Sequence, residues 1–257
     1  METKKIKLRK TINLVLSIIS LCCIAFILVI NTYRAFNPDF WDFMLRVPDT
    51  YVTCIAGILV VFAKPLLKRF NIEMSYNLSS ILIFTNILAS FGGNIFHLYK
   101  WTTWYDTFIH LLTGVVYCFL GVGFYYLLNG KRDVNRVVIL LFAVFFSITG
   151  EVIWEIIEYI MDGMSDISNM QRFSDPVTRE PYIGREALQD TMKDIILAFI
   201  GSAIFFVGGI IEFSFRKEGT LIESFYMMNT SPSGLVSDEE DDINEEELQD
   251  HSNYHIT

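Results

Sequence analysis

The sequence predicts an all-α membrane protein, a polytopic bundle of six transmembrane helices, and three observations favour this class. Hydrophobic residues make up 52% of the 257 residues, and the mean hydropathy is +0.39. The apolar residues fall in long runs separated by short charged segments, which is typical of polytopic helical membrane proteins. No segment has the alternating pattern of an outer-membrane β-barrel.

Six apolar runs each approach the ~20 residues that cross the hydrocarbon core of a bilayer. They cover residues 12–30, 51–67, 78–99, 105–128, 137–160 and 192–213 and form one membrane domain, 12–213. The first run follows a basic segment, residues 1–11, and could be mistaken for a signal peptide. It is longer than the ~7–15 apolar residues of such a peptide, and no A-x-A-like cleavage site follows it, so we expect a retained span.

The basic residues predict the orientation of these spans. Lys and Arg are frequent before the first run, between the second and third, and between the fourth and fifth, and they are scarcer in the two segments between. By the positive-inside rule this alternation predicts a cytoplasmic N-terminus. An even number of spans then returns the chain to the cytoplasm. The loop at 161–187 departs from the alternation because it carries three arginines together with several acids.

The net charge of −9 arises at the C-terminus. From Thr230 onward there are nine acids and no Lys or Arg. Such a composition predicts that residues 214–257 are an acidic, disordered cytoplasmic tail. No basic patch interleaved with aromatic residues is present, so nucleic acid is not an expected partner. The four cysteines lie inside apolar runs without CxxC spacing, which indicates apolar packing rather than disulfides or a zinc ribbon.

The fifth run ends in the sequence "GEVIWEIIEYIMD", which carries a stripe of acids. Glu151, Glu155, Glu158 and Asp162 follow one another at spacings of four, three and four residues. On a helix these spacings keep all four within a stripe of roughly 60°. Ionisable residues inside a membrane span are costly, so they usually face the bundle and have a function. The stripe therefore predicts a polar site between helices.

Two other runs begin with matching pairs one helical turn apart, Asp106 with His110 and Asp190 with Asp194. With the N-terminus inside, both pairs and the acidic stripe lie in the outer half of the membrane. Depth can be counted at 1.5 Å per residue. The predicted layers are, from the outside inward, Asp106, Glu158 and Asp190, then His110, Glu155 and Asp194, then Glu151.

The first hypothesis for this cluster is a metal site. Carboxylates and imidazole that project from several helices at one level are how metal centres in bundle cores are built, and a divalent cation would cancel their mutual repulsion. With an open coordination position, the metal would activate water to hydrolyse a lipid or cell-envelope substrate. The candidate ligands are Asp106, His110, Glu155, Glu158, Asp190 and Asp194.

Two alternatives stay open. Chains of Asp, Glu and His serve as relays in proton- or cation-coupled transporters, although no inverted repeat is visible in this sequence. In the third hypothesis the protein has a structural role, and acids near helix ends are simply solvated, with Asp190 as a helix cap. Solvation explains the outermost acids but leaves the deeper ones without partners. His97 is a secondary candidate, since it is more typical of an interfacial residue beside Tyr99 and Trp101.

The same segments resemble those of the YjdF-like bacterial membrane proteins. That family has a Y-D-x-x-x-H-x-x-x-G segment, an E-x-x-E-[WY/F] segment and a D-x-x-x-D-x-x-x-x-x-x-G segment in successive helices. The matching stretches here are "YDTFIHLLTG", "WEIIEY" and "DTMKDIILAFIG". Asp162 and the "NMQ" that ends at Gln171 are similar to a Gram-positive branch of the family.

The resemblance covers residues 78–213 and implies a multi-pass protein of the bacterial cytoplasmic membrane, whose partner is the lipid bilayer. It implies no particular activity. A weaker likeness exists to VanZ-like membrane proteins, which carry D-x-x-x-H and D-x-x-x-N patterns. In this chain Leu197 or a neighbour stands in place of the Asn of the second pattern.

Overall fold

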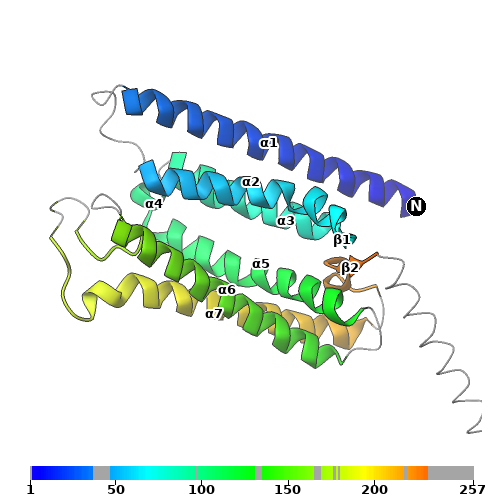
Figure 1. Cartoon of the computed structure of the whole chain (residues 1–257). Helices are drawn as coiled ribbons and strands as arrows, with labels where there is room; N and C mark the ends of the chain where they lie inside the picture. The colour runs from blue at the N-terminus through cyan, green and yellow to red at the C-terminus, as the bar shows by residue number, and fades with distance from the viewer. Residues whose placement is uncertain are drawn as a thin grey trace, which may run out of the picture.

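The protein is a bundle of nearly parallel and antiparallel helices (Figure 1). The computed structural model describes residues 2–36, 47–95, 98–130, 135–164, 169–175, 178, 180–216 and 219–230. The helices are α1 (Glu2–Phe36), α2 (Val47–Arg69), α3 (Tyr76–Asn86), α4 (Leu98–Trp101), α5 (Thr103–Asn129), α6 (Arg136–Met164) and α7 (Gln189–Phe215). A π-helix, η1 (Ile87–Ile95), continues α3, and two short 3-10 turns are η2 (Glu186–Leu188) and η3 (Ile222–Ser224).

The predicted all-α membrane class is confirmed. Among the described residues, five helical stretches are long and apolar enough to cross a membrane, and they lie in α1, α2, α5, α6 and the segment from η2 through α7. The remaining predicted span, 78–99, runs through α3 and η1, where the helix changes from α to π at Ile87, and its last residues fall in α4. Two consecutive glycines, Gly92 and Gly93, are poor α-helix formers. They leave room for the rings of Tyr105 and Tyr99, which pack directly against the π-helix.

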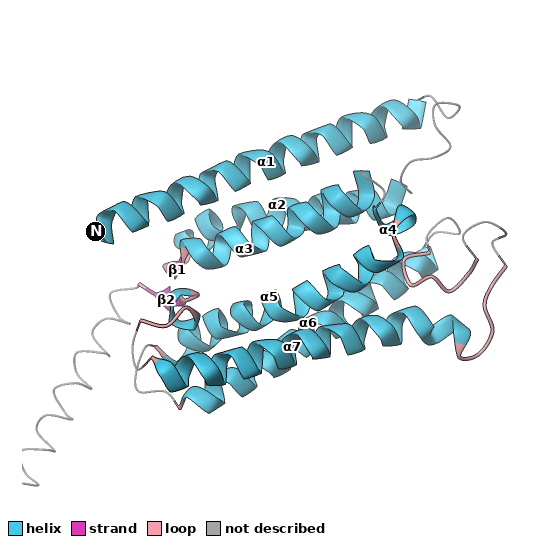
Figure 2. Ribbon diagram, turned by 180° about the vertical axis from the view of Figure 1, so that it is seen from behind, coloured by secondary structure: helices cyan, strands magenta, loops and turns pink. Residues whose placement is uncertain are grey.

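The helices form two groups, α1–α3 and α5–α7 (Figure 2). At the end near the N-terminus, the groups are joined by a small antiparallel sheet of β1 (Ile72–Met74) and β2 (Met227–Asn229). Buried apolar side chains from both groups surround this joint, among them Leu78, Leu140 and Met227. The half of the bundle next to the sheet is therefore filled by an apolar core.

The start of α1 and the end of α7 lie at the same end of the bundle (Figure 1). This arrangement is the one expected for an even number of crossings. The predicted disordered tail began at residue 214, but η3 and β2 lie within 219–230, so the expectation of disorder was wrong for that stretch. The rest of the tail, from 231 onward, lies outside the described residues. The segment between α6 and α7 lies at the opposite end, where the predicted polar residues gather.

Candidate metal site at the loop end of the bundle

Direct backbone contact between α5 and α7 positions the site. A Cβ atom on Gly114 would clash with the backbone of Ala198, and one on Gly201 would clash with the carbonyl oxygen of Leu111. Small residues at such positions let membrane helices approach closely. His110 lies one turn from Gly114 along α5, and Asp194 lies about two turns from Gly201 along α7. The close approach therefore holds these two side chains at the same level.

A buried pair of serines ties α6 to the same contact. The Ser147 hydroxyl donates to the carbonyl oxygen of Gly114 at 2.7 Å, and its oxygen lies 3.0 Å from the hydroxyl of Ser202 on α7. Both serines are 0% exposed. Hydrogen bonds between polar side chains and a neighbouring backbone fix the register of helices in a membrane. The three helices thus meet in one defined register just below the site.

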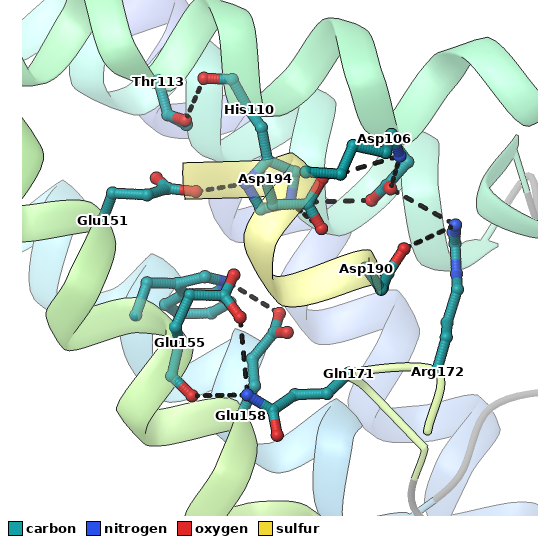
Figure 3. Close-up of polar contacts among 12 residues, drawn as sticks. Asp106, His110, Thr113, Glu151, Glu155, Glu158, Gln171, Arg172, Asp190 and Asp194 are labelled. Atoms are coloured by element: carbon teal, nitrogen blue, oxygen red, sulfur yellow. Dashed lines mark hydrogen bonds and ion pairs between the residues drawn. The ribbon is translucent and has the colours of Figure 1, made fainter. Parts of the chain in front are cut away.

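His110 is the centre of the site (Figure 3). Its Nδ1 is hydrogen-bonded to Oε1 of Glu151 on α6. An ionised carboxylate can only accept, which makes Nδ1 the donor. On the other side of the ring, Nε2 lies 3.6 Å from Oδ1 of Asp106 and 3.7 Å from Oδ2 of Asp194. All four side chains are buried. The imidazole is therefore surrounded by carboxylates from all three helices.

Two cations hold the outer oxygens of these carboxylates. Lys193 Nζ lies 3.1 Å from Oδ2 of Asp106 and 3.6 Å from Oδ1 of Asp194. Arg172 Nη1 lies 3.3 Å from Oδ2 of Asp106 and 3.3 Å from Oδ1 of Asp190. Asp106 and Asp194 thus turn one oxygen toward the imidazole and the other toward a cation. Sequence reasoning missed both cations as site residues, although Lys193 follows Asp190 by three residues and directly precedes Asp194.

Arg172 comes from the segment between α6 and α7 and closes the site from outside the helices. Partial burial lowers the pKa of its guanidinium, but the carboxylates of Asp106 and Asp190 raise this pKa more, so the group stays charged. Asp162 anchors the segment, because its two carboxylate oxygens accept the backbone N–H groups of Met170 at 2.7 Å and Gln171 at 2.9 Å. Arg172 itself has a φ of 46°, which is uncommon outside glycine.

The remaining predicted residues lie around this centre. The backbone oxygen of Glu155 accepts a hydrogen bond from the Gln171 side chain at 3.2 Å. One carboxylate oxygen of Glu155, one of Glu151 and one ring nitrogen of His110 all lie within 4.8 Å of one another. Glu158 accepts the indole N–H of Trp154 at 2.7 Å. Asp190 is linked to the centre through its ion pair with Arg172. His97 lies outside the described residues.

One predicted layer is wrong by a turn. Glu155 was expected at the depth of His110, but Glu151 is the residue that contacts the imidazole. The depth count assumed that the outer ends of α5 and α6 are level. From the contact between His110 and Glu151, α6 continues outward for 13 residues to Met164, whereas α5 begins only seven residues away at Thr103, so α6 projects beyond α5. The predicted pairing of His110 with Asp194 across α5 and α7 agrees with the structure.

The charges at the site do not balance. Six carboxylates gather around two basic side chains, Arg172 and Lys193, and one imidazole. Two buried oxygens, Oε1 of Glu155 and Oδ1 of Asp194, accept no hydrogen bond from the described residues. Buried carboxylates without enough partners repel one another, and a bound cation relieves that repulsion. The carboxylates are Asp106, Glu151, Glu155, Glu158, Asp190 and Asp194.

The geometry of Asp106, His110 and Asp194 fits a divalent metal ion. With metal–ligand bonds of about 2.1 Å, ligand atoms in a tetrahedral site are about 3.4 Å apart. The observed separations of 3.6 and 3.7 Å around Nε2 are close to that value. A histidine that binds metal through one nitrogen usually donates its other N–H to a carboxylate. Glu151 is in that position, so this group of residues could hold a metal.

A cavity of about 330 Å³ adjoins the centre, between α2, α3 and η1 on one side and α5 and α6 on the other. Asp106 and His110 line one of its walls, and Arg172 lies at its loop end. Farther from the loops its lining becomes apolar, with Val60 and Val116. A largely apolar cavity with a few convergent polar groups is the usual form of a small-molecule site.

Comparison with known families agrees with the membrane class. The model of a family described as "Predicted membrane protein (DUF2238)" matches residues 14–213, which include nearly all of the helical bundle and every member of the site. The match is consistent with the resemblance to YjdF-like proteins and gives no support to the weaker likeness to VanZ-like proteins. No curated protein and no solved structure matches this chain.

Proposed function

The chain belongs to the DUF2238 family of predicted membrane proteins, and we propose that it is a metal-dependent protein that acts on a lipid or cell-envelope molecule. The proposed metal ligands are Oδ1 of Asp106, Nε2 of His110 and Oδ2 of Asp194. The proposed location is the cytoplasmic membrane of a bacterium, with the site in the outer half of the bilayer.

The observation that carries this proposal is the arrangement around His110. Both ring nitrogens are engaged, Nδ1 by Glu151 and Nε2 by the inner oxygens of Asp106 and Asp194. Lys193 and Arg172 hold the outer oxygens and so orient the two aspartates. In metal centres the ligating side chains are typically held in position by a surrounding set of hydrogen-bond and ion-pair partners.

A bound divalent ion would polarise a substrate oxygen and lower the pKa of a coordinated water. The residues of the chain would do the rest. Glu151 fixes the orientation of the imidazole, and the adjoining cavity gives a substrate access to Asp106 and His110. The cavity is polar at the loop end and apolar toward the middle of the bundle. A lipid in one leaflet has the same polarity, which supports an amphiphilic substrate.

Elemental mass spectrometry on protein purified in mild detergent without chelators tests the proposal. We expect near-stoichiometric divalent metal in the wild type and its loss in a variant carrying His110→Ala and Asp194→Asn. Glu180→Gln is the matched control, since Glu180 is an exposed carboxylate at the same end of the bundle. Absence of metal from the wild type, even after metal is added back, would overturn the proposal.

Flux measurements in proteoliposomes separate this proposal from coupled transport. A transporter would show proton or cation flux that Glu155→Gln abolishes without unfolding the protein. A metal-dependent enzyme would show no such flux. The apolar core of the opposite half of the bundle, which includes Phe119 and Phe205 in edge-to-face contact, supports a site at one end rather than a path through the bundle.

A further inference from the structure

Glu158 is a buried carboxylate that the proposed metal set does not use. It lines the cavity and is 8% exposed. Its described hydrogen-bond partner is the neutral indole N–H of Trp154, and it forms no ion pair with any described Lys, Arg or His. A buried carboxylate without a cation is unfavourable unless something else supplies the positive charge. Glu158 is therefore placed to receive a cation from a ligand.

Aromatic side chains share the cavity with Glu158. Trp154 and Tyr117 line it from α6 and α5, and Tyr99 lines it from α4. The faces of such rings attract cations, most strongly when the cation has lost its water, and Trp is the best of the three. An acid among aromatic rings suits an organic ammonium group better than a strongly hydrated metal ion, which prefers several oxygen ligands.

The opposite wall of the cavity carries a buried hydroxyl group without a hydrogen-bond partner among the described residues. Thr85 on α3 is 6% exposed, and its hydroxyl oxygen has no hydrogen-bond partner among the described residues. Thr85 also lines the cavity. Buried hydroxyl groups are nearly always hydrogen-bonded, so an unpaired one at a cavity wall points to a partner supplied by a ligand.

We propose that this cavity binds the ammonium group of an amphiphile, with Glu158 as its counter-ion and Trp154, Tyr99 and Tyr117 as the aromatic wall. If the bound amphiphile is the substrate, this inference rests on the proposed function and adds that the substrate carries an amine. Binding of the ammonium group itself does not require the metal. An anionic headgroup is disfavoured because Glu158, Glu151 and Asp106 line the same cavity, and Arg172 is already paired with two carboxylates.

Two probes with the same alkyl chain and opposite headgroup charge, decyltrimethylammonium and decyl sulfate, test this inference. Binding is measured by isothermal titration calorimetry on the full-length protein in dodecyl maltoside, a neutral detergent. We expect saturable binding of decyltrimethylammonium to the wild type and no comparable binding of decyl sulfate. Because Glu158→Gln keeps an acceptor for Trp154 but removes the charge, affinity should fall about tenfold or more, as is typical of losing a charge-assisted contact.

The controls separate this inference from the proposed function. Glu180→Gln should bind the ammonium probe as the wild type does, and Glu158→Gln should keep its metal and its melting temperature. The His110→Ala, Asp194→Asn variant should lose metal but still bind the probe. Probe binding in a protein that never holds metal would support the ammonium site and overturn only the proposed function. Equal affinity in Glu158→Gln and wild type, or a preference for decyl sulfate, would overturn the inference.

Discussion

Glu151 on α6 hydrogen-bonds to His110 on α5 through Nδ1, the ring nitrogen that faces away from Asp106 and Asp194. The bond determines which nitrogen carries the proton. With Nδ1 as the donor, a neutral imidazole presents the lone pair of Nε2 to the two aspartates. Glu151 is 1% exposed, so water competes little with it for this hydrogen bond.

Glu151→Gln should weaken metal binding without removing any proposed ligand. Loss of an outer carboxylate partner of a metal-bound histidine typically costs about 10- to 100-fold in metal affinity. Competition with a chelator of known affinity measures the change, and Glu180→Gln serves as the exposed control. An unchanged affinity would mean that Glu151 only fills space beside His110.

Gly201→Ala should separate α5 from α7 and disturb the site from a distance. The new Cβ would clash with the carbonyl oxygen of Leu111, which a rigid backbone cannot avoid without moving the helix. Overpacking of this kind typically costs about 1–3 kcal/mol. We expect a lower melting temperature in detergent and less bound metal.

Gly208→Ala is the matched control on the same helix, since nothing lies within 4 Å of a Cβ placed there. It should leave the melting temperature equal or slightly higher, because Ala is the better helix former. If both variants behaved alike, close packing of α5 on α7 would not be what holds the site together.

Much of the site was predictable because lipid restricts where charge can lie. Acids on a membrane-crossing helix must face the bundle, so the spacing of Glu151, Glu155 and Glu158 already indicated one buried face of α6. The pairs Asp106 with His110 and Asp190 with Asp194 indicated two further faces by the same reasoning. These predictions required only helical periodicity and the cost of burying charge.

What could not be predicted depends on contacts between distant segments. Whether Glu151 or Glu155 meets His110 is decided by how far α6 projects past the start of α5, which the sequence of either helix alone does not specify. Arg172 reaches the site because of the path of the segment between α6 and α7. Asp162 anchors that segment through backbone N–H groups, and backbone groups carry no sequence signal. The change from α-helix to π-helix at Ile87 likewise occurs where Tyr105, distant in sequence, packs against η1, and the Tyr105 hydroxyl donates to the carbonyl oxygen of Leu88 at 2.8 Å.

Arg172→Gln should destabilise the metal-free protein and increase the stabilisation that metal provides. Without the guanidinium, Asp106 and Asp190 lose a cation, which should cost about 1 kcal/mol because the Arg172 side chain is partly exposed. The site also becomes more negative, so a divalent cation should bind more tightly. The measurement is the melting temperature with metal and with chelator.

Arg185→Gln is the control for that experiment, because Arg185 is an exposed arginine of the same connecting segment. The metal-dependent rise in melting temperature should be larger in Arg172→Gln than in Arg185→Gln. A smaller rise would instead make Arg172 part of what holds the metal, for example through the position of Asp106.

Asp162→Ala should release the segment that carries Gln171 and Arg172. Its carboxylate accepts the backbone N–H groups of Met170 and Gln171, and without it these groups have lost their described acceptor. Hydrogen exchange at these two amides should then become at least about tenfold faster, since exchange reports the free energy of local opening. Exchange in the middle of α5 should not change, because the serine and glycine contacts there do not involve Asp162. Unchanged protection at Met170 and Gln171 would show that the ion pairs of Arg172 alone hold the segment over the site.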